Sequence, residues 1–286
     1  MKVEHQIRQD VAARVARDAG MLLTTFASQQ AAGADLDVAT KTSHTDPVSN
    51  ADRASERQIT DALRQAFATD GIITEEGQGQ QPGSSGYRWV IDPLDGTVNF
   101  LNGIGLWCVS IACVDDTGPV AAAIYHPGFD ELFTACRDGG ATMNGHVLAC
   151  APDGPLQHSL LATGFSYEAA VREVQGTELA TLLAHVRDIR RGGAAALDLA
   201  WVAAGRYSAY FEMALQTWDW AAGALLVTEA GGTVSSFLRH TEGKDRQLVI
   251  AGPKTMNETL SEWQRRHASL RPVTLAQLLP PHDTSL

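Results

Sequence analysis

Helical and strand-like stretches follow one another in blocks along the 286-residue chain, and this order limits the folds it can adopt. Apolar residues recur at mainly four-residue intervals over 3–26 and again over 59–67, which predicts two amphipathic helices. Short β-like runs separated by turns predict an antiparallel meander at 106–114, 120–125 and 131–136. Blocks of this kind favour a layered α+β or α/β fold over a strictly alternating Rossmann fold.

The second half of the chain returns to helices and short strands. Strands are predicted at 159–163, 207–211 and 248–251. Helices are predicted from Gly192-Gly193 to Ala204, from Trp218 to Ala230 with Thr217 as its cap, and over 255–269. We therefore expect one domain over 1–270, with an α+β half at about 1–150 and an α/β half at about 151–270, followed by a Pro-containing tail over 271–286.

The charge balance restricts the partners of the protein. Lys plus Arg number 22 and Asp plus Glu 33, so the formal net charge is −11. Such a chain has no general field that attracts nucleic acid or an anionic membrane, and phosphate must be bound locally, by cations or backbone N–H groups. Four cysteines without a C-x-x-C pair, and no apolar run long enough to span a membrane, predict a soluble cytoplasmic protein.

An apolar strand runs into two carboxylates in the segment W-V-I-D-P-L-D-G-T at 89–97. Because Pro93 cannot donate to a β-ladder, we expect the chain to leave its sheet at Asp92. Asp92, Asp95 and a backbone carbonyl would then offer oxygen ligands that suit Mg²⁺ or Mn²⁺ and not zinc. The alternative from these nine residues alone is a turn with solvated acids.

Further acidic residues elsewhere in the chain could complete such a metal site. Glu75 and Glu76 close a short apolar run, and Asp219 lies at the start of a predicted helix. Asp52 belongs to S-N-A-D, which matches a helix-start pattern. Each of these acids also has an ordinary structural explanation, either as a solvated strand end or as a first-turn residue that satisfies the helix dipole.

Taken together, the motifs resemble the inositol monophosphatase family of Mg²⁺-dependent, lithium-sensitive phosphatases. Two signature segments are nearly complete: W-V-I-D-P-L-D-G-T-V-N-F at 89–100 and W-D-W-A-A-G-A-L-L-V-T-E-A-G-G at 218–232. Shorter pieces follow in the same order as in the family: Lys41 to Asp46, S-N-A-D at 49–52, T-E-E at 74–76, G-A-T-M-N-G at 140–145, G-G-A-A-A-L-D at 192–198 and Y-F-E-M at 210–213.

The resemblance implies a five-layer α/β/α/β/α sandwich, two or three Mg²⁺ ions and a homodimer. In the family arrangement, the first ion would be bound by Glu75, Asp92 and the carbonyl of Leu94. The second ion would be bound by Asp92, Asp95 and Asp219. A weaker third ion would be held by Asp52 with Glu75. The loop around His44 between these elements is expected to form a mobile flap over 41–52.

The resemblance also implies the substrate contacts and the mechanism. Phosphate would meet Asp95, Gly96 and Thr97, and the rest of the substrate would meet Gly193, Ala194, Ala195, Glu212 and Asp219. A water activated by the metals would attack the phosphorus without a covalent intermediate. Glu75, with Thr97 relaying, is the implied proton acceptor.

The substrate is expected to be a small phosphorylated polyol. Val98-Asn99-Phe100 is similar to the inositol phosphatase branch, and Glu212 can accept hydrogen bonds from ring hydroxyls, so myo-inositol monophosphate is favoured. Sister phosphatases that act on histidinol phosphate, 3′-phosphoadenosine phosphate or fructose 1,6-bisphosphate share the metal site and stay open. A regulatory binding protein on the same scaffold is a further alternative.

Overall fold

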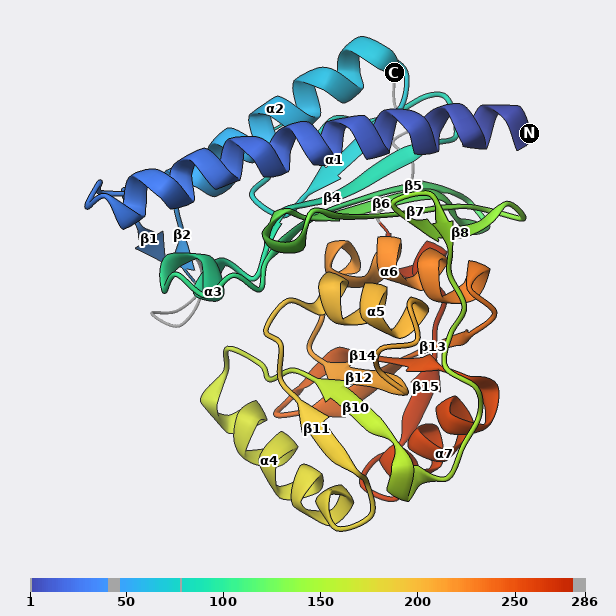
Figure 1. Cartoon of the computed structure of the whole chain (residues 1–286). Coiled ribbons are helices and arrows are strands. Elements are labelled where there is room, and N and C mark those ends of the chain that lie inside the picture. Colours follow the sequence, from blue (N-terminus) through green and yellow to red (C-terminus); the bar gives the residue numbers. More distant parts are fainter. Residues whose placement is uncertain (1, 41–46, 78, 280–286) are drawn as a thin grey trace.

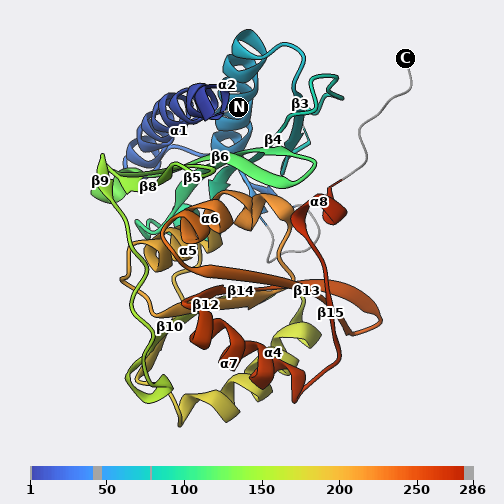
Figure 2. The same ribbon diagram turned by 90° about the vertical axis from the view of Figure 1, so that its right-hand side faces the viewer.

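The computed structural model describes residues 2–40, 47–77 and 79–279, which form five layers (Figures 1 and 2). From one side to the other, the layers are α1 (Lys2–Ala31) with α2 (Asn50–Ala66), a seven-stranded sheet, α5 (Ala195–Ala203) with α6 (Thr217–Glu229), a six-stranded sheet, and α4 (Ala169–Leu183) with α7 (Lys254–Arg265). This is the α/β/α/β/α sandwich that the family resemblance implied.

The seven-stranded sheet contains the predicted meander and carries the acidic motif. Its strands, in spatial order, are β3 (Gly71–Thr74), β4 (Arg88–Asp95), β5 (Cys108–Asp115), β6 (Gly118–His126), β7 (Glu131–Cys136), β8 (Gly140–Met143) and β9 (His146–Val147). Only the β3–β4 pair is parallel among these described strands, and every other neighbouring pair is antiparallel. The meander is therefore confirmed, and it begins one strand earlier than expected.

The six-stranded sheet is built from the second half of the chain. Its strands, in spatial order, are β11 (Asp188–Arg190), β10 (Leu160–Thr163), β12 (Ala209–Met213), β14 (Lys244–Gly252), β13 (Thr233–Thr241) and β15 (Leu270–Pro272). The strands predicted at 159–163, 207–211 and 248–251 are present, with shifted ends. Strands β11, β13 and β15 were not predicted, because their sequences are short or carry polar residues without a clear two-residue period.

The long first helix packs on the outer face of the seven-stranded sheet. Its buried positions include Ala12, Val15, Ala19 and Leu23, which repeat at three- and four-residue spacings. A Cβ added to Gly20 would lie 2.4 Å from the Cδ1 atom of Tyr125 on β6, so the helix approaches the sheet too closely there for any side chain. The first helix is confirmed, and small residues set its distance from the sheet.

A buried ion pair joins α1 to Asp70, the residue before β3. One guanidinium nitrogen of Arg8 lies 3.2 Å from a carboxylate oxygen of Asp70, and both side chains are almost fully buried. Asp70 also accepts hydrogen bonds from the Ser85 hydroxyl at 2.6 Å and from the Trp89 indole N–H at 3.0 Å. The Arg8 guanidinium stacks on the Tyr87 ring, 3.8 Å from its centroid. This network holds Ser85 and Tyr87, which directly precede β4, close to α1.

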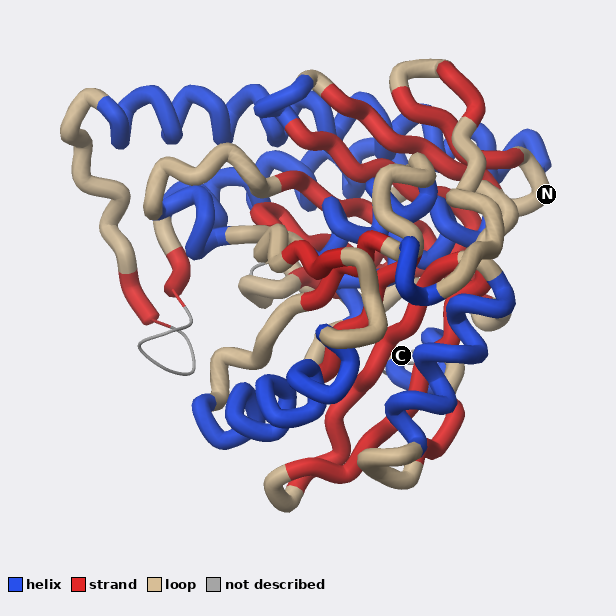
Figure 3. The backbone as a smooth tube through the Cα atoms, turned by 60° about the horizontal axis from the view of Figure 1, so that its bottom comes forward, coloured by secondary structure: helices blue, strands red, loops and turns tan. Residues whose placement is uncertain are grey.

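Two short strands follow α1 before the chain turns into α2. They are β1 (Ala39–Thr40) and β2 (Pro47–Val48), and they pair in antiparallel fashion below the end of α1 (Figure 3). Much of the predicted flap, including Lys41, His44 and Asp46, lies outside the described residues. The predicted helix start at Ser49 is confirmed, since Ser49 is the N-cap of α2.

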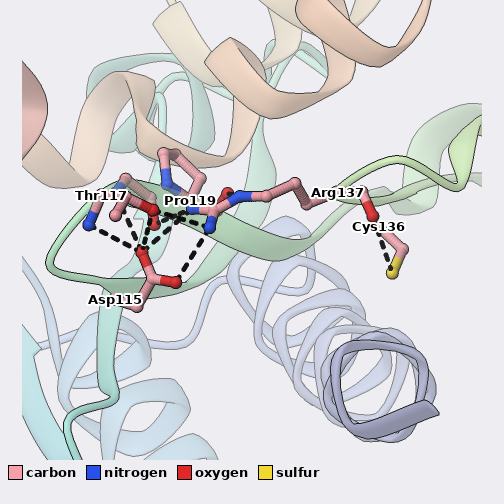
Figure 4. A network of polar contacts seen from close by, with 6 residues as sticks. Asp115, Thr117, Pro119, Cys136 and Arg137 are labelled. Atoms are coloured by element: carbon pink, nitrogen blue, oxygen red, sulfur yellow. Dashed lines mark hydrogen bonds and ion pairs between the residues drawn. The ribbon is translucent and has the colours of Figure 1, made fainter. Parts of the chain in front are cut away.

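The far end of β5 is closed by a polar turn that Figure 4 shows in detail. Asp115 accepts hydrogen bonds from the hydroxyl and the N–H of Thr117, at 2.7 and 2.8 Å. The guanidinium of Arg137 donates to Asp115 at 2.9 Å and to the Pro119 carbonyl at 3.0 Å. Burial acts to raise the pKa of Asp115, but hydrogen bonds from Arg137 and Thr117 outweigh it and lower the pKa. The turn fixes the β5–β6 register at the end remote from Asp92.

The C-terminal segment crosses from one layer to another. Strand β15 joins the edge of the six-stranded sheet, and α8 (Leu275–Leu278) then packs near α6 (Figure 2). Thr274 caps this short helix, and Leu275 and Leu279 are buried in the core cluster around α5 and α6. Thus part of the predicted tail is an integral strap. No described helix is both long and apolar enough to cross a membrane.

Ending the chain after residue 269 should lower the free energy of unfolding by about 3 kcal/mol, because two buried leucines lose their place in the core. Urea unfolding followed by circular dichroism measures this change. A chain that ends after Leu279 keeps both leucines and is the matched control, for which we expect the full-length stability. Equal stability of the two shortened chains would show that the strap contributes nothing.

Candidate active site

The predicted site residues converge on one cleft of about 670 Å³ that lies where residues of both halves of the chain meet. Ten of the twelve predicted residues line it: Glu75, Asp92, Leu94, Asp95, Gly96, Thr97, Gly193, Ala195, Glu212 and Asp219. The other two, Asp52 and Ala194, are buried beside the cleft without lining it. The volume of the cleft is within the usual range for small-molecule sites.

The acidic motif stays in the sheet, contrary to the expectation that the chain would leave it at Asp92. Strand β4 continues to Asp95, which pairs with Cys108, and the register is irregular only between Asp92 and Asp95. Pro93 is tolerated because it falls in this irregular stretch, where its missing N–H breaks no regular ladder bond. The Asp92 carboxylate accepts a hydrogen bond from the Leu94 N–H at 3.0 Å. The irregularity turns both carboxylates and the intervening carbonyl towards the cleft wall.

Gly96 makes the sharp turn that follows. Its φ of 92° is in the left-handed region, and a Cβ there would lie 2.9 Å from the Leu106 carbonyl oxygen. Only glycine fits this position, which starts the short helix α3 (Thr97–Leu101). The Thr97 hydroxyl then lies 3.0 Å from the Leu94 carbonyl oxygen and 3.0 Å from an oxygen of Asp52.

Asp52 serves both as a helix cap and as a partner of the motif. One of its oxygens accepts hydrogen bonds from the backbone N–H and the hydroxyl of Ser49, at 2.8 and 2.6 Å. The other oxygen accepts from Thr97 at 3.0 Å. The structural explanation of Asp52 as a first-turn acid is therefore correct, and the same side chain also reaches the cleft through Thr97.

Asp95 is held by the start of α5, from the other half of the chain. The N–H groups of Ala195 and Ala196 donate to its two oxygens at 3.2 and 2.7 Å. Burial raises the pKa of Asp95 to about 6, although these two backbone hydrogen bonds act to lower it. The N-terminus of the helix is thus used to orient a carboxylate.

Asp219 has a similar double position at the start of α6. Gln216, and not Thr217, is the N-cap of this helix, and its N–H donates to Asp219 at 2.7 Å. The predicted Thr217 cap is therefore wrong, because the helix begins at Thr217 itself. Asp219 keeps its place in the first turn and also lines the cleft.

The carboxylates influence one another strongly. Burial raises the pKa of Asp92 well above its usual value, and the charges of Glu75, Asp95 and Asp219 raise it further. Burial and the charge of Glu75 likewise raise the pKa of Asp219. Such a group of buried acids is stable as carboxylates only when cations are nearby.

The donor set fits hard divalent cations in its chemistry. All the candidate ligands are oxygens, from carboxylates and the Leu94 carbonyl, as Mg²⁺ prefers. Among the described residues, no three or more His, Cys, Asp and Glu side chains are already gathered tightly enough to hold an ion. The mutual repulsion of these buried acids is the reason that a cation would bind favourably among them.

Glu212 lies at the far side of the predicted substrate contacts. It is the fourth residue of β12, and it accepts a hydrogen bond from the buried Tyr210 hydroxyl at 2.7 Å. Burial raises the pKa of Glu212 to about 7, against the lowering effects of Tyr210 and Arg191. A Cβ added to Gly164 would lie 2.0 Å from Glu212, so this glycine makes room for the carboxylate.

Several residues that build the cleft were not predicted. Asn99 donates to the carbonyls of Leu106 and Gly192, at 2.7 and 2.9 Å, and so ties α3 to the turn before α5. Arg190 pairs with Asp188 at 2.6 Å, whereas Arg191 lines the cleft. The family motif contains Asn99, but its partner is 93 residues away and gives no local signal.

Comparison with known proteins agrees with this geometry. The model of the family described as "Inositol monophosphatase family" matches residues 6–269 of this chain. A Pseudomonas aeruginosa protein named Nus factor SuhB is 42% identical over 85% of this chain and 90% of its own length. An inositol-1-monophosphatase from Mycobacterium bovis is 39% identical, over 86% of this chain and 88% of its own.

Solved structures agree as well. The extragenic suppressor protein suhB from Bartonella henselae is 37% identical and superimposes with a TM-score of 0.81, over 90% of this chain and 98% of its own. The matched stretch contains the strands and helices that carry the carboxylates of the cleft. The chain described here belongs to the inositol monophosphatase family.

Proposed function

We propose that this protein is a Mg²⁺-dependent phosphomonoesterase, with myo-inositol monophosphate as the favoured substrate and the cytoplasm as its compartment. The observation that carries the proposal is the convergence of Glu75, Asp92, Asp95 and Asp219 on one cleft with the Gly96 turn. Two or three ions would be held by the carboxylates and the Leu94 carbonyl, with Asp52 near the weakest. When bound, Mg²⁺ neutralises the phosphate dianion and makes the attacking water more acidic.

The side chains around Thr97 would orient the attacking water. The Thr97 hydroxyl has one hydrogen, which goes either to Asp52 or to the Leu94 carbonyl. Its oxygen lone pair can therefore accept a hydrogen bond from water, and the Glu75 carboxylate would take the proton. Backbone N–H groups after Gly96 would contact phosphate oxygens, and Glu212 would accept hydrogen bonds from the hydroxyls of the polyol.

A substrate panel tests the choice of phosphate ester. Phosphate release would be measured with Mg²⁺ and either myo-inositol 1-phosphate, histidinol phosphate, 3′-phosphoadenosine 5′-phosphate or fructose 1,6-bisphosphate. We expect a higher kcat/KM for an inositol phosphate than for histidinol phosphate or the nucleotide. A preference for either of these two would move the protein to a sister branch, and failure to hydrolyse any ester would refute the proposal.

Removal of divalent cations should abolish activity and lower thermal stability. Without cations the buried carboxylates repel one another, so Mg²⁺ binding to the folded state should raise Tm as its concentration increases. Activity and Tm would be recorded after EDTA treatment and again after addition of Mg²⁺ or Mn²⁺, with K⁺ as the control for ionic strength. An EDTA-treated protein with full activity and unchanged Tm would contradict a cation-dependent site.

A regulatory role is the second candidate, since a relative that is 42% identical is named a Nus factor. The two roles are compatible on one scaffold, and a homodimer is proposed for either. Affinity capture with wild-type protein and with a cleft variant separates them. A partner bound equally by both would indicate a surface function independent of catalysis, and a failure to capture any partner would leave the catalytic role alone.

A further inference from the structure

Tyr210 is a fully buried residue of β12, the strand that also carries Glu212. Residues two apart in a β-strand point to the same face of the sheet, so Tyr210 and Glu212 share one face. Tyr210 accordingly packs in the core cluster around α5 and α6, whereas Phe211 and Met213 belong to the cluster that includes residues of α4 and α7. The Tyr210 hydroxyl therefore lies within the helical layer between the two sheets (Figure 1).

This hydroxyl fixes one oxygen of the Glu212 carboxylate. It donates to Oε2 at 2.7 Å, and no other hydrogen bond from the described part of the chain reaches this carboxylate. Burial and the charges of Glu212 and Asp198 raise the pKa of Tyr210 well above its usual value, so the phenol keeps its hydrogen and remains a donor. Gly164, the residue after β10, lies against the same carboxylate, since a Cβ there would be 2.0 Å from Oε2 and 2.3 Å from Oε1.

The second oxygen of Glu212 remains for a donor in the cleft. Oε1 receives no hydrogen bond from the described residues, and it is not enclosed as the partnerless Oδ1 of Asp198 is. Glu212 itself lines the cleft. A glutamate has several side-chain torsions, so an untethered carboxylate would rotate and offer its oxygens in several positions. The hydrogen bond to Oε2 reduces this freedom before a substrate binds, and it presents Oε1 in one orientation.

We propose that Tyr210 is a positioning residue for polyol specificity, which fixes Glu212 so that Oε1 accepts a hydrogen bond from one ring hydroxyl of the substrate. The inference rests on the proposed phosphatase function and concerns recognition of the alcohol part of the ester. Tyr210 is not part of the cleft lining, so its effect on a substrate must pass through Glu212. Since its hydroxyl is bonded to none of the proposed metal ligands, the effect should appear in substrate binding and not in the chemical step.

Tyr210→Phe tests this role, because it removes the hydroxyl and keeps the buried ring. Mg²⁺-dependent phosphate release would be measured with myo-inositol 1-phosphate and with cyclohexyl phosphate, which has the same six-carbon ring without free hydroxyls. We expect the wild-type protein to have the lower KM for the inositol ester. In the variant this KM should rise about tenfold with kcat nearly unchanged, as the loss of one hydrogen bond to a charged group predicts. The KM for cyclohexyl phosphate should stay at its wild-type value, which also shows that the variant is folded.

Tyr125→Phe is the matched control. The Tyr125 hydroxyl also donates to a carboxylate, that of Asp130 at 2.9 Å, and Tyr125 lies outside the cleft lining. Loss of this hydroxyl should leave both KM values unchanged. Any change shared by the two tyrosine variants would therefore come from the general loss of a hydrogen bond and not from the position of Glu212.

Two further variants test the route through Glu212. Gly164→Ala places a methyl group against the same carboxylate without changing Tyr210, and it should also raise KM for the inositol ester alone. In a double-mutant cycle, the effect of Tyr210→Phe on KM should disappear when Glu212 is replaced by alanine. A residue that acted only on the stability of the core would give neither result.

The outcomes separate this inference from the proposed function. Equal wild-type KM values for the two esters, an unchanged KM of Tyr210→Phe for the inositol ester, or a rise of equal size for both esters would overturn the inference alone. An effect of Tyr210→Phe that persists in the Glu212→Ala background would do the same. Absence of Mg²⁺-dependent hydrolysis of both esters by the wild-type protein would overturn the proposed function itself.

Discussion

Asp92→Asn should lower kcat/KM for a phosphate ester by about a thousandfold or more at saturating Mg²⁺, since the proposed sharing of this ligand by two cations would supply several kcal/mol. Asp92 is 2% exposed at the irregular end of β4, and its charge is coupled to those of Glu75, Asp95 and Asp219. Asparagine has the same shape and can still accept the hydrogen bond from the Leu94 N–H. The fold should therefore persist while the charge that attracts cations is lost.

Steady-state phosphate release and the Mg²⁺ dependence of Tm measure the two consequences of this substitution. The increase of Tm with Mg²⁺ should be smaller in the variant, because one negative ligand is missing. Asp138→Asn is the matched control, since Asp138 is exposed, lies outside the cleft, and has a φ of 60° that asparagine tolerates. A folded Asp92→Asn protein with near-normal turnover would remove the proposed role of this residue.

Asp70→Ala should destabilise the protein by about 3–5 kcal/mol, because the buried Arg8 then keeps only the half-exposed Glu4 as an ion-pair partner. Asp70 is 1% exposed and accepts hydrogen bonds from Arg8, Ser85 and Trp89. The substitution thus removes the acceptor of two buried donors, the Arg8 guanidinium and the Trp89 indole N–H, and of the exposed Ser85 hydroxyl. Equilibrium unfolding in urea measures the loss.

A double variant separates the lost pair from the unpaired charge. Combining Arg8→Met with Asp70→Leu replaces both charges by apolar groups, and it should recover part of the stability lost in Asp70→Ala. Asp61→Ala is the exposed control, because its pair with Arg64 involves an acid that is 76% exposed and should contribute less than about 1 kcal/mol. Equal losses for Asp61→Ala and Asp70→Ala would refute the importance of burial here.

The parts that the sequence predicts well are those whose signals are local. Ser49 and Asp52 form a capping box within four residues, and the helix begins where this pattern places it. The meander alternates with clear turns, so its strands were expected within a few residues. The acidic motif at 89–97 became interpretable as a site because the family resemblance supplied partners for Asp92 and Asp95.

The parts that the sequence predicts poorly depend on partners far along the chain. Strand β13 carries Arg239, which is buried only because Glu178 and Gln264 pair with it from 61 and 25 residues away. The sequence of β13 therefore appears polar, and no strand was predicted there. Lys244 was missed for the same reason, since nothing near it in the sequence indicates that β14 begins beside the cleft. Pro93 led to the wrong prediction that the chain leaves the sheet at Asp92, because the irregular register that accommodates Pro93 depends on the pairing of β4 with β5.

The hydrogen bonds from Ala195 and Ala196 to Asp95 have a consequence for how catalytic competence is acquired. Asp95 belongs to the seven-stranded sheet, whereas its two donors precede β12 of the six-stranded sheet, so neither half of the chain contains the whole of the proposed site. Separately expressed halves would each be silent in a phosphatase assay, and signal would appear only on reassociation. The proposed phosphatase activity would therefore appear only after the two halves have docked. A refolding experiment that measures the recovery of activity would give the rate of docking, and not the rate at which either sheet forms.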